Sequence, residues 1–365
     1  MAPGTDLNWD RLSQRLSRRF TIEPMAPGRM EDLGLFLKRA YADQPLARAF
    51  EDSGRILQRL RWLQESLPGS QGRNPLGWLC LKQGRIAGYF TALPALLAVR
   101  GRELPIWWGR ELMVAPEARR EGAGPFLVIA AVRAAGEKPF LIAGLNDESF
   151  SLFRRMGFLD MGRIPLYAKA ALAARVQRFF FRRGRKGNTL SFLKLERFDE
   201  RYDRWWRSIE GAFPCVVRRD GATMAWRYLR HPDHRYTVFA ALRGEDFCGV
   251  GVVRHGRSKG LPAGFITELL AHPGDPEALR ALVAHAEDSL TVPGTAVPGT
   301  VNPVFIRCAV HHPALGRSLS RAGFLRVPSP IHWMMAHARG PSALEGLTRR
   351  EDWLLNGGDS DLDVV

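Results

Sequence analysis

The sequence lacks any apolar segment long enough to cross a membrane. A membrane-spanning helix needs about 20 consecutive apolar residues, and one of the longest apolar runs here is FLVIAAV at 126–132. The first residues, MAPGTDLNWDRLSQRL, also lack the apolar centre of a secretory signal. We therefore expect a cytoplasmic protein.

Cysteine is scarce as well. The chain of 365 residues has 4 cysteines, and they lie far apart with no CxxC pair and no histidine at metal-ligand spacing: Cys80, Cys215, Cys248 and Cys308. This distribution predicts buried, reduced thiols and no metal site.

Acidic residues are outnumbered, and the imbalance is uneven. The chain carries 53 Lys+Arg against 37 Asp+Glu, a net charge of +16. Residues 1–190 have 31 basic and 17 acidic residues, whereas residues 191–365 have 22 and 20. A basic half indicates an anionic partner, and a nucleotide cofactor, nucleic acid or an anionic membrane would each fit.

Hydrophobic periodicity alternates between strand and helix patterns, which predicts mixed α/β layers (α+β in some schemes). We expect helices at 30–42, 46–66, 125–136 and 149–157, a hairpin at 77–92 that turns at Gln83-Gly84, and strands at 106–114, 140–145 and 158–168.

Three short segments recur in the same order. LKQGRIAG (81–88) is echoed by LRGEDFCG (242–249), ELMVAP (111–116) by ELLAHP (268–273), and RMGFL (155–159) by RAGFL (321–325). The offsets are 161, 157 and 166 residues, which predicts two copies of one fold. We place the copies at 21–170 and 196–340, with an N-terminal extension (1–20), a basic linker helix (171–195) and a tail (341–365) whose Trp353 either docks or stays mobile.

The turn APEARREGAGPF (115–126) joins a predicted strand to a predicted helix. A helix N-terminus carries unpaired N–H groups and a partial positive charge, so it suits a pyrophosphate. Gly122 and Gly124 let the backbone approach the phosphate, Arg119 and Arg120 add charged donors, and Pro125 suits the first helical position. The turn matches neither a dinucleotide GxGxxG nor a Walker loop.

Residues 119–124, RREGAG, resemble the (Q/R)xxGx(G/A) loop of the GNAT acyltransferase superfamily, which holds the coenzyme A pyrophosphate. The preceding strand ends in Val-x-Pro, and RRMGF (154–158) follows at the family's spacing. The resemblance covers nearly all of 21–170. It implies an acyl-CoA co-substrate and direct transfer of the acyl group to an amine.

The resemblance also implies site residues. The predicted cofactor contacts are Met113, Val114, Arg119, Arg120, Glu121, Gly122, Ala123, Gly124, Pro125, Asn146 and Phe153, the last at a position where many members have Tyr. Glu111 is the candidate base, with a structural ion pair to Arg110 or Arg102 as the alternative. Tyr167 is the candidate acid, unless it is an ordinary buried strand residue. Asn146 alternatively begins the next helix.

The second copy lacks the loop. Fourteen residues separate Glu111 from Pro125, but only 8 separate Glu268 from the matching Pro276, where Asp275 caps the helix. We expect this copy not to bind coenzyme A in the same manner.

Two further segments invite function. WRYLRHPDHRY (226–236) offers Trp226, Arg227 and His231 for a sugar or carboxylate acceptor, or forms a helix end stopped by Pro232. RVQRFFFRRGRK (175–186) combines an aromatic face with arginines, which fits either a helix at the inner membrane surface or one packed between the two copies.

We therefore expect an acyl-CoA-dependent N-acyltransferase, with acetyl-CoA or another acyl-CoA, acting on a small-molecule or amino-sugar amine of cell-envelope polysaccharide metabolism. Two alternatives stay open. A Fem-type aminoacyl transferase would use the basic half to bind tRNA, although the intact loop makes nucleic acid the less favoured partner. A non-catalytic scaffold would attach to the membrane through 175–186.

Overall fold

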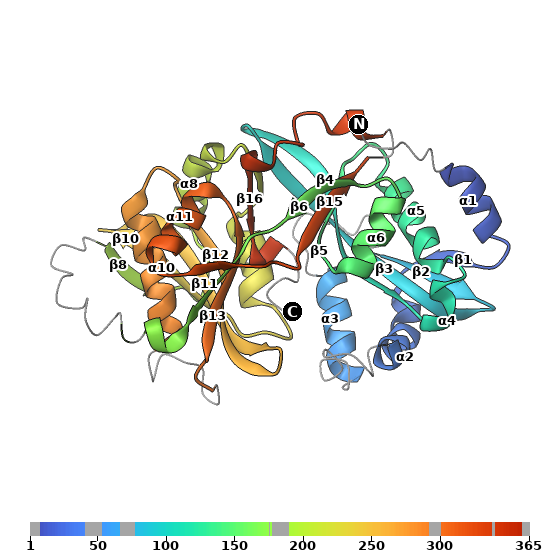
Figure 1. Cartoon of the computed structure of the whole chain (residues 1–365), viewed down its shortest axis with the longest axis horizontal. Coiled ribbons are helices and arrows are strands. Elements are labelled where there is room, and N and C mark those ends of the chain that lie inside the picture. The colour runs from blue at the N-terminus through green and yellow to red at the C-terminus, as the bar shows by residue number, and fades with distance from the viewer. Residues whose placement is uncertain are drawn as a thin grey trace. The chain divides into compact units, whose positions relative to one another are not determined.

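The computed structural model of the chain describes residues 8–40, 53–65, 77–174, 176, 190–291, 301–337 and 340–359. It contains two compact units that are interleaved along the sequence. The first unit comprises Met1–Leu96, Pro105–Gly162 and His332–Thr348, and the second comprises Leu97–Leu104, Arg163–Ile331 and Arg349–Val365. Figure 1 shows the helices and strands of both units.

Among the described residues, the sheet of the first unit has seven strands. In spatial order they are β1 (Thr21–Pro24), β2 (Gly77–Lys82), β3 (Arg85–Val99), β4 (Arg102–Val114), β5 (Phe140–Leu145), β15 (His332–Ala336) and β6 (Leu159–Arg163). The pair β4–β5 is parallel, and the pairs β1–β2, β2–β3 and β5–β15 are antiparallel. The predicted hairpin is confirmed, since Gln83 and Gly84 turn the chain with φ angles of 50° and 77°.

Helices cover the sheet of the first unit on both faces (Figure 1). They are α1 (Trp9–Leu16), α2 (Met30–Ala40), α3 (Ser53–Glu65), α4 (Pro116–Arg119), α5 (Ala123–Ala135) and α6 (Asp147–Arg155), with short 3-10 turns η1 (Pro27–Arg29) and η6 (Pro341–Leu344). The predicted start of α5 at Pro125 was two residues late. Pro125 is the third helical residue, a position whose N–H has no intrahelical partner to lose.

The sheet of the second unit repeats this order. Its strands are β8 (Leu190–Lys194), β10 (Thr237–Arg243), β11 (Asp246–Ser258), β12 (Leu261–Ala271), β13 (Phe305–His311), β7 (Leu166–Ala170) and β14 (Leu325–Val327). The parallel pair β12–β13 stands where the first unit has β4–β5. The repeated strand order confirms the mixed α/β class and the two copies of one fold.

Further elements surround the second sheet. They are α8 (Glu200–Ile209), η4 (Glu210–Ala212), β9 (Cys215–Val217), α9 (Gly221–Met224), η5 (Ala225–Leu229), α10 (Pro276–Thr291), α11 (Pro313–Arg321), η7 (Arg350–Asp352), β16 (Trp353–Asn356) and η8 (Gly357–Asp359). Trp353 is fully buried in β16, so residues 349–359 of the tail dock on the second unit.

Each copy gives its last strand to the sheet of the other unit. β7 follows β6 in the chain but pairs with β13 and β14. β15 follows β14 but pairs with β5 and lies between β5 and β6. The predicted boundaries, 21–170 and 196–340, follow the order along the chain, whereas the compact units exchange these strands.

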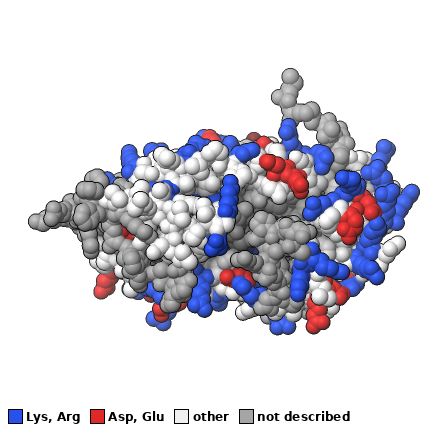
Figure 2. All heavy atoms as spheres, turned by 60° about the horizontal axis from the view of Figure 1, so that its bottom comes forward, with Lys and Arg blue, Asp and Glu red and all other residues white. Residues whose placement is uncertain are grey.

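Each unit has its own apolar core. All four cysteines are buried and free, which confirms the predicted thiols. Within the described ranges, no helix has both the length and the apolar character to cross a membrane. Lys and Arg outnumber Asp and Glu on the face shown in Figure 2, in keeping with the net charge.

Candidate functional site

The parallel pairing of β4 with β5 is short. It runs from Trp107 opposite Phe140 to Gly109 opposite Ile142, although β4 continues to Val114. Paired strands stay within hydrogen-bonding distance only along their ladder, so β4 and β5 separate beyond Gly109. The last five residues of β4, including Glu111, Met113 and Val114, lie along this separation.

The loop after β4 leads into the N-terminus of α5, whose first residues Ala123 and Gly124 are buried. Gly122 adopts a left-handed φ of 102° and is the N-cap of α5. The backbone N–H groups of Ala123 and Gly124, in the first turn of α5, have no intrahelical acceptor. Together with the positive end of the helix dipole, such groups are able to receive an anion.

The two glycines of the loop have packing reasons as well. A Cβ on Gly122 would lie 2.6 Å from the Leu16 side chain, and α1, which carries Leu16, packs against α5. A Cβ on Gly124 would lie 3.2 Å from Leu152 of α6. The sequence suggested only close approach of a phosphate. The structure shows that glycine here also lets α1 and α6 approach the loop.

Side chains brace the loop and leave two arginines accessible. Arg119 donates from Nε to the carbonyl of Val114 at 3.1 Å. Lys82, at the end of β2, pairs with Glu121 at 2.6 Å, a contact the sequence analysis missed because 39 residues separate the partners. Arg119 and Arg120 are exposed, and neither pairs with a carboxylate among the described residues. The loop therefore presents both guanidinium groups to solvent.

Glu111 is held by the face of β4 that meets α3. Its carboxylate forms an ion pair with Arg59 of α3 and accepts a hydrogen bond from the hydroxyl of Tyr89 on β3. Its N–H donates to the hydroxyl of Thr91 at 3.2 Å. Arg59 comes from a distant helix, and the sequence analysis, which named Arg110 or Arg102, did not predict it. The side chain of Glu111 remains 11% exposed, so a proton can still reach it.

Other predicted cofactor residues take structural positions. Met113 and Val114 are buried at the end of β4. Asn146 caps α6 by accepting from the N–H of Ser149 at 2.9 Å, which bears out the alternative that it begins this helix. Phe153 is fully buried against Phe158, with ring centroids 4.8 Å apart. Its ring thus lies in the apolar core. The sequence had predicted instead that it contacts the cofactor.

Tyr167 lies in the second unit. It stands on β7 opposite Cys308 and Arg326 of the neighbouring strands, and burial raises the pKa of its hydroxyl. The strand exchange determines this position. Its role as a proton donor stays a prediction.

The second copy has a glutamate at the matching point. Pairing of β12 with β13 ends at Ile266 opposite Cys308, so Glu268 stands two residues beyond the last pair, as Glu111 does in the first unit. Glu268 is buried and accepts from Arg219 Nε at 3.3 Å and from the Tyr228 hydroxyl at 2.7 Å. Burial raises the pKa of Glu268, and Arg219 opposes that effect.

The tail fills the space beside Glu268. Asn356 of β16 pairs opposite Val310 of β13, and its side-chain amide donates to Glu268 and to the carbonyl of Leu269. Asp359 pairs with Arg219 at 2.5 Å. In the second copy the tail thus occupies the position beside β13. No described strand occupies the corresponding position beside β5 in the first copy.

The three residues predicted to bind an acceptor lie near this tail. Trp226 and Arg227 are buried in η5, a single π-helical turn. Arg227 donates from Nε to the carbonyl of Gly358 at 3.0 Å and from Nη1 to the Tyr236 hydroxyl at 3.3 Å. His231 Nδ1 accepts from two backbone N–H groups of the following turn. These contacts support local structure, and acceptor binding stays a prediction.

Residues 37–158 match the family model "Acetyltransferase (GNAT) family". No curated protein matches the sequence. Among solved structures, a GCN5-related N-acetyltransferase from Anabaena variabilis has a TM-score of 0.61 at 14% identity, over 87% of this chain and 72% of that one. A probable N-acyltransferase from Enterococcus faecalis has a TM-score of 0.60 at 12% identity, over 90% and 75%.

Saccharomyces cerevisiae N-myristoyltransferase, solved with bound myristoyl-CoA, has a TM-score of 0.55 at 12% identity, over 87% of this chain and 82% of that one. At such identities these structures show a shared fold, whereas the family match rests on sequence. Residues 37–158 thus match the acetyltransferase (GNAT) family by sequence, and the strand order of the first unit recurs in the second.

Proposed function

We propose that the first unit is an acyl-CoA-dependent N-acyltransferase, with acetyl-CoA as its simplest co-substrate. The observation that carries the proposal is the first turn of α5, whose N–H groups have no intrahelical acceptor, together with two exposed arginines and a separated β4–β5 pair. The acceptor is a small-molecule amine. Its expected class, an amino sugar of cell-envelope polysaccharide, stays a prediction.

The loop fits the diphosphate of coenzyme A. The N–H groups of Ala123 and Gly124 are suitable donors to phosphate oxygens, and the guanidinium groups of Arg119 and Arg120 add charge-assisted hydrogen bonds. The Lys82–Glu121 pair and the Arg119–Val114 bond fix the shape of the loop. Such a prepared site binds without first ordering its own chain, which favours affinity.

We assign the role of base to Glu111. Acyl transfer to an ammonium requires removal of a proton from the nitrogen before it attacks the carbonyl carbon of the thioester. As the C–N bond forms, the C–S bond breaks and the sulfur leaves with its electron pair, finally as a thiol. The bond from Tyr89 and the pair with Arg59 orient the Glu111 carboxylate. An N–H near Met113 or Val114 supplies a donor to the carbonyl oxygen.

Replacing Arg119 and Arg120 together with alanine is expected to raise the Kd for acetyl-CoA at least about tenfold, since loss of even one charge-assisted hydrogen bond costs about 1.5–3 kcal/mol. Calorimetric titration of the full chain measures this directly. The matched control removes two adjacent exposed cations of α2, in the variant Lys38→Ala/Arg39→Ala.

An unchanged Kd in the loop variant, or the same weakening in the α2 variant, would refute the assignment of the loop. The second outcome would mean that acetyl-CoA responds only to net charge.

The membrane scaffold and the Fem-type aminoacyl transferase are each tested by a separate experiment. The segment 175–186, on which a membrane scaffold depends, lies outside the described residues apart from Val176. Flotation with anionic liposomes, comparing the parent chain with a Phe179→Ala/Phe180→Ala variant, decides that scaffold. A salt-sensitive gel shift with bulk tRNA decides the Fem-type alternative.

A further inference from the structure

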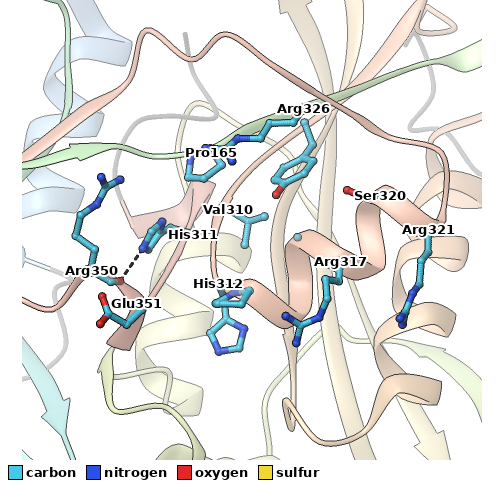
Figure 3. Close-up of a pocket in the computed structure, with 13 residues that line it drawn as sticks. Pro165, Val310, His311, His312, Arg317, Ser320, Arg321, Arg326, Arg350 and Glu351 are labelled. Carbon is cyan, nitrogen blue, oxygen red and sulfur yellow. Dashed lines mark hydrogen bonds between the residues drawn. The ribbon is translucent and has the colours of Figure 1, made fainter.

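The second unit contains a cavity that the proposed acyl transfer does not use. Its volume is about 690 Å³, and all of its lining residues belong to that unit. It is bounded by the end of β13, by β7 and β14, by one face of α11, and by η7 (Figure 3). This volume lies within the range of small-molecule sites, about 300–1,000 Å³.

Four arginines surround the cavity, which we call the arginine pocket. Arg317 and Arg321 extend from α11, one turn apart, Arg326 reaches over from β14, and Arg350 stands on the opposite side (Figure 3). Three separate elements thus contribute guanidinium groups to one space.

The charge of the arginine pocket is not neutralised from within. Arg317, Arg321 and Arg326 form no ion pair with any other residue that the structure describes. The one acidic residue in the lining, Glu351, pairs instead with Arg349 at 3.1 Å. Several like charges facing one cavity repel one another, so an anion between them would be stabilised.

The remaining wall is neutral. Burial lowers the pKa of His311 and lowers that of His312 to about 4, so neither ring adds charge near neutral pH. His311 is further fixed by a 2.7 Å contact between its Nε2 and the carbonyl of Arg350. The ring of Tyr167 packs on Gly316, where any side chain would collide with the phenol oxygen. This wall can hold an uncharged part of a ligand.

Arginine forks match phosphate better than a point charge does. The planar guanidinium donates two parallel hydrogen bonds to a pair of phosphate oxygens. A single phosphate fills only a small part of about 690 Å³, which leaves room for a larger body against Pro165, Val310 and Tyr167 (Figure 3).

We propose that the arginine pocket binds a small molecule that carries a phosphate or diphosphate group. This site is separate from the loop of the first unit and gives the second copy a ligand of its own. It does not depend on the acyltransferase assignment.

Calorimetric titration of the full chain with inorganic pyrophosphate, without divalent metal, tests the proposal. The pocket variant is Arg317→Gln/Arg326→Gln. The control, Arg204→Gln/Arg280→Gln, removes two exposed arginines of the same unit outside the pocket, on α8 and α10, so the net charge changes equally. Any binding at the first-unit loop is common to all three chains and cancels in the comparison.

The pocket variant is expected to raise the pyrophosphate Kd at least about tenfold, the weakening that loss of one charge-assisted hydrogen bond produces. The control is expected to stay within about twofold of the parent chain, because neither Arg204 nor Arg280 lines the pocket. Equal weakening in both variants, or no binding to the parent chain at millimolar pyrophosphate, overturns the proposal.

Vesicles containing phosphatidic acid form the second arm of the experiment. If the parent chain sediments with these vesicles and the pocket variant does not, the phosphate belongs to a lipid headgroup. Pyrophosphate binding without sedimentation assigns it to a soluble ligand. Both results support phosphate recognition by the arginine pocket.

Discussion

Replacing Glu111 with glutamine is expected to lower the kcat of acyl transfer by about 10²–10⁴-fold, the usual contribution of a general base. The amide keeps the shape of the side chain but cannot take a proton from the ammonium. Affinity for acetyl-CoA should stay within about twofold of the parent value, because the loop that holds the diphosphate is untouched. Release of the coenzyme A thiol, followed with the best acceptor from a panel of amines, measures the effect.

The Glu111→Gln variant also removes the partner of Arg59, so some stability is lost with it. The rate is therefore compared well below the melting temperature of the variant. A catalytic Glu111 predicts that the rising limb of the pH–rate profile disappears. A variant that melts earlier but keeps both kcat and this limb would show that the ion pair with Arg59 is the whole role of Glu111.

Replacing Glu268 with glutamine is expected to have the opposite pattern. The free energy of unfolding of the second unit should fall by about 3–5 kcal/mol, the cost of breaking a buried ion pair. Arg219, whose side chain is only 4% exposed, would lose one of its two carboxylates. The new amide N–H would face donors from Tyr228 and Asn356. Urea unfolding followed by circular dichroism measures the change.

The control for this prediction is Glu196→Gln. Glu196 makes a surface ion pair with Lys194, and its side chain is 82% exposed, so its replacement should change stability by less than about 1 kcal/mol. If Glu268→Gln and Glu196→Gln unfold alike, the buried cluster does not hold the tail in place.

Glu111 and Glu268 stand at matching points of the two sheets but have different surroundings. Both stand two residues beyond the last parallel pair of their sheets. Beside Glu111 the described strands leave the position next to β5 open, whereas beside Glu268 the tail inserts β16 and η8. The second copy thus combines a helix start without the phosphate loop and a docked tail beside its glutamate.

Local chemistry made several features predictable. Gln83-Gly84 and Gly122 require left-handed backbone, which only a few residue types adopt readily, so turns could be placed by inspection. The repeated motifs were enough to predict two copies because the strands that contain them pair in the same order in both units. Pro125 led to a predicted helix start two residues too late. Proline is tolerated throughout the first turn, so it does not mark one position within it.

Long-range contacts were not predictable from one sequence. Arg59 meets Glu111 only after α3 packs against the sheet, and no local pattern indicates that choice over Arg110. The strand exchange is hidden for a similar reason: β7 and β15 have ordinary strand sequences, and nothing in them specifies which sheet they join. Tyr167 and the arginine pocket follow from this exchange, so they became visible only in three dimensions.

Hydrogen exchange of the full chain, with and without saturating acetyl-CoA, measures most directly whether amides at the start of α5 receive the diphosphate. Slower exchange in peptides covering residues 119–127, with no change around 268–280, is the predicted result. Equal exchange at 119–127 in the two samples, under conditions where calorimetry shows binding, would contradict a phosphate cradle at this loop.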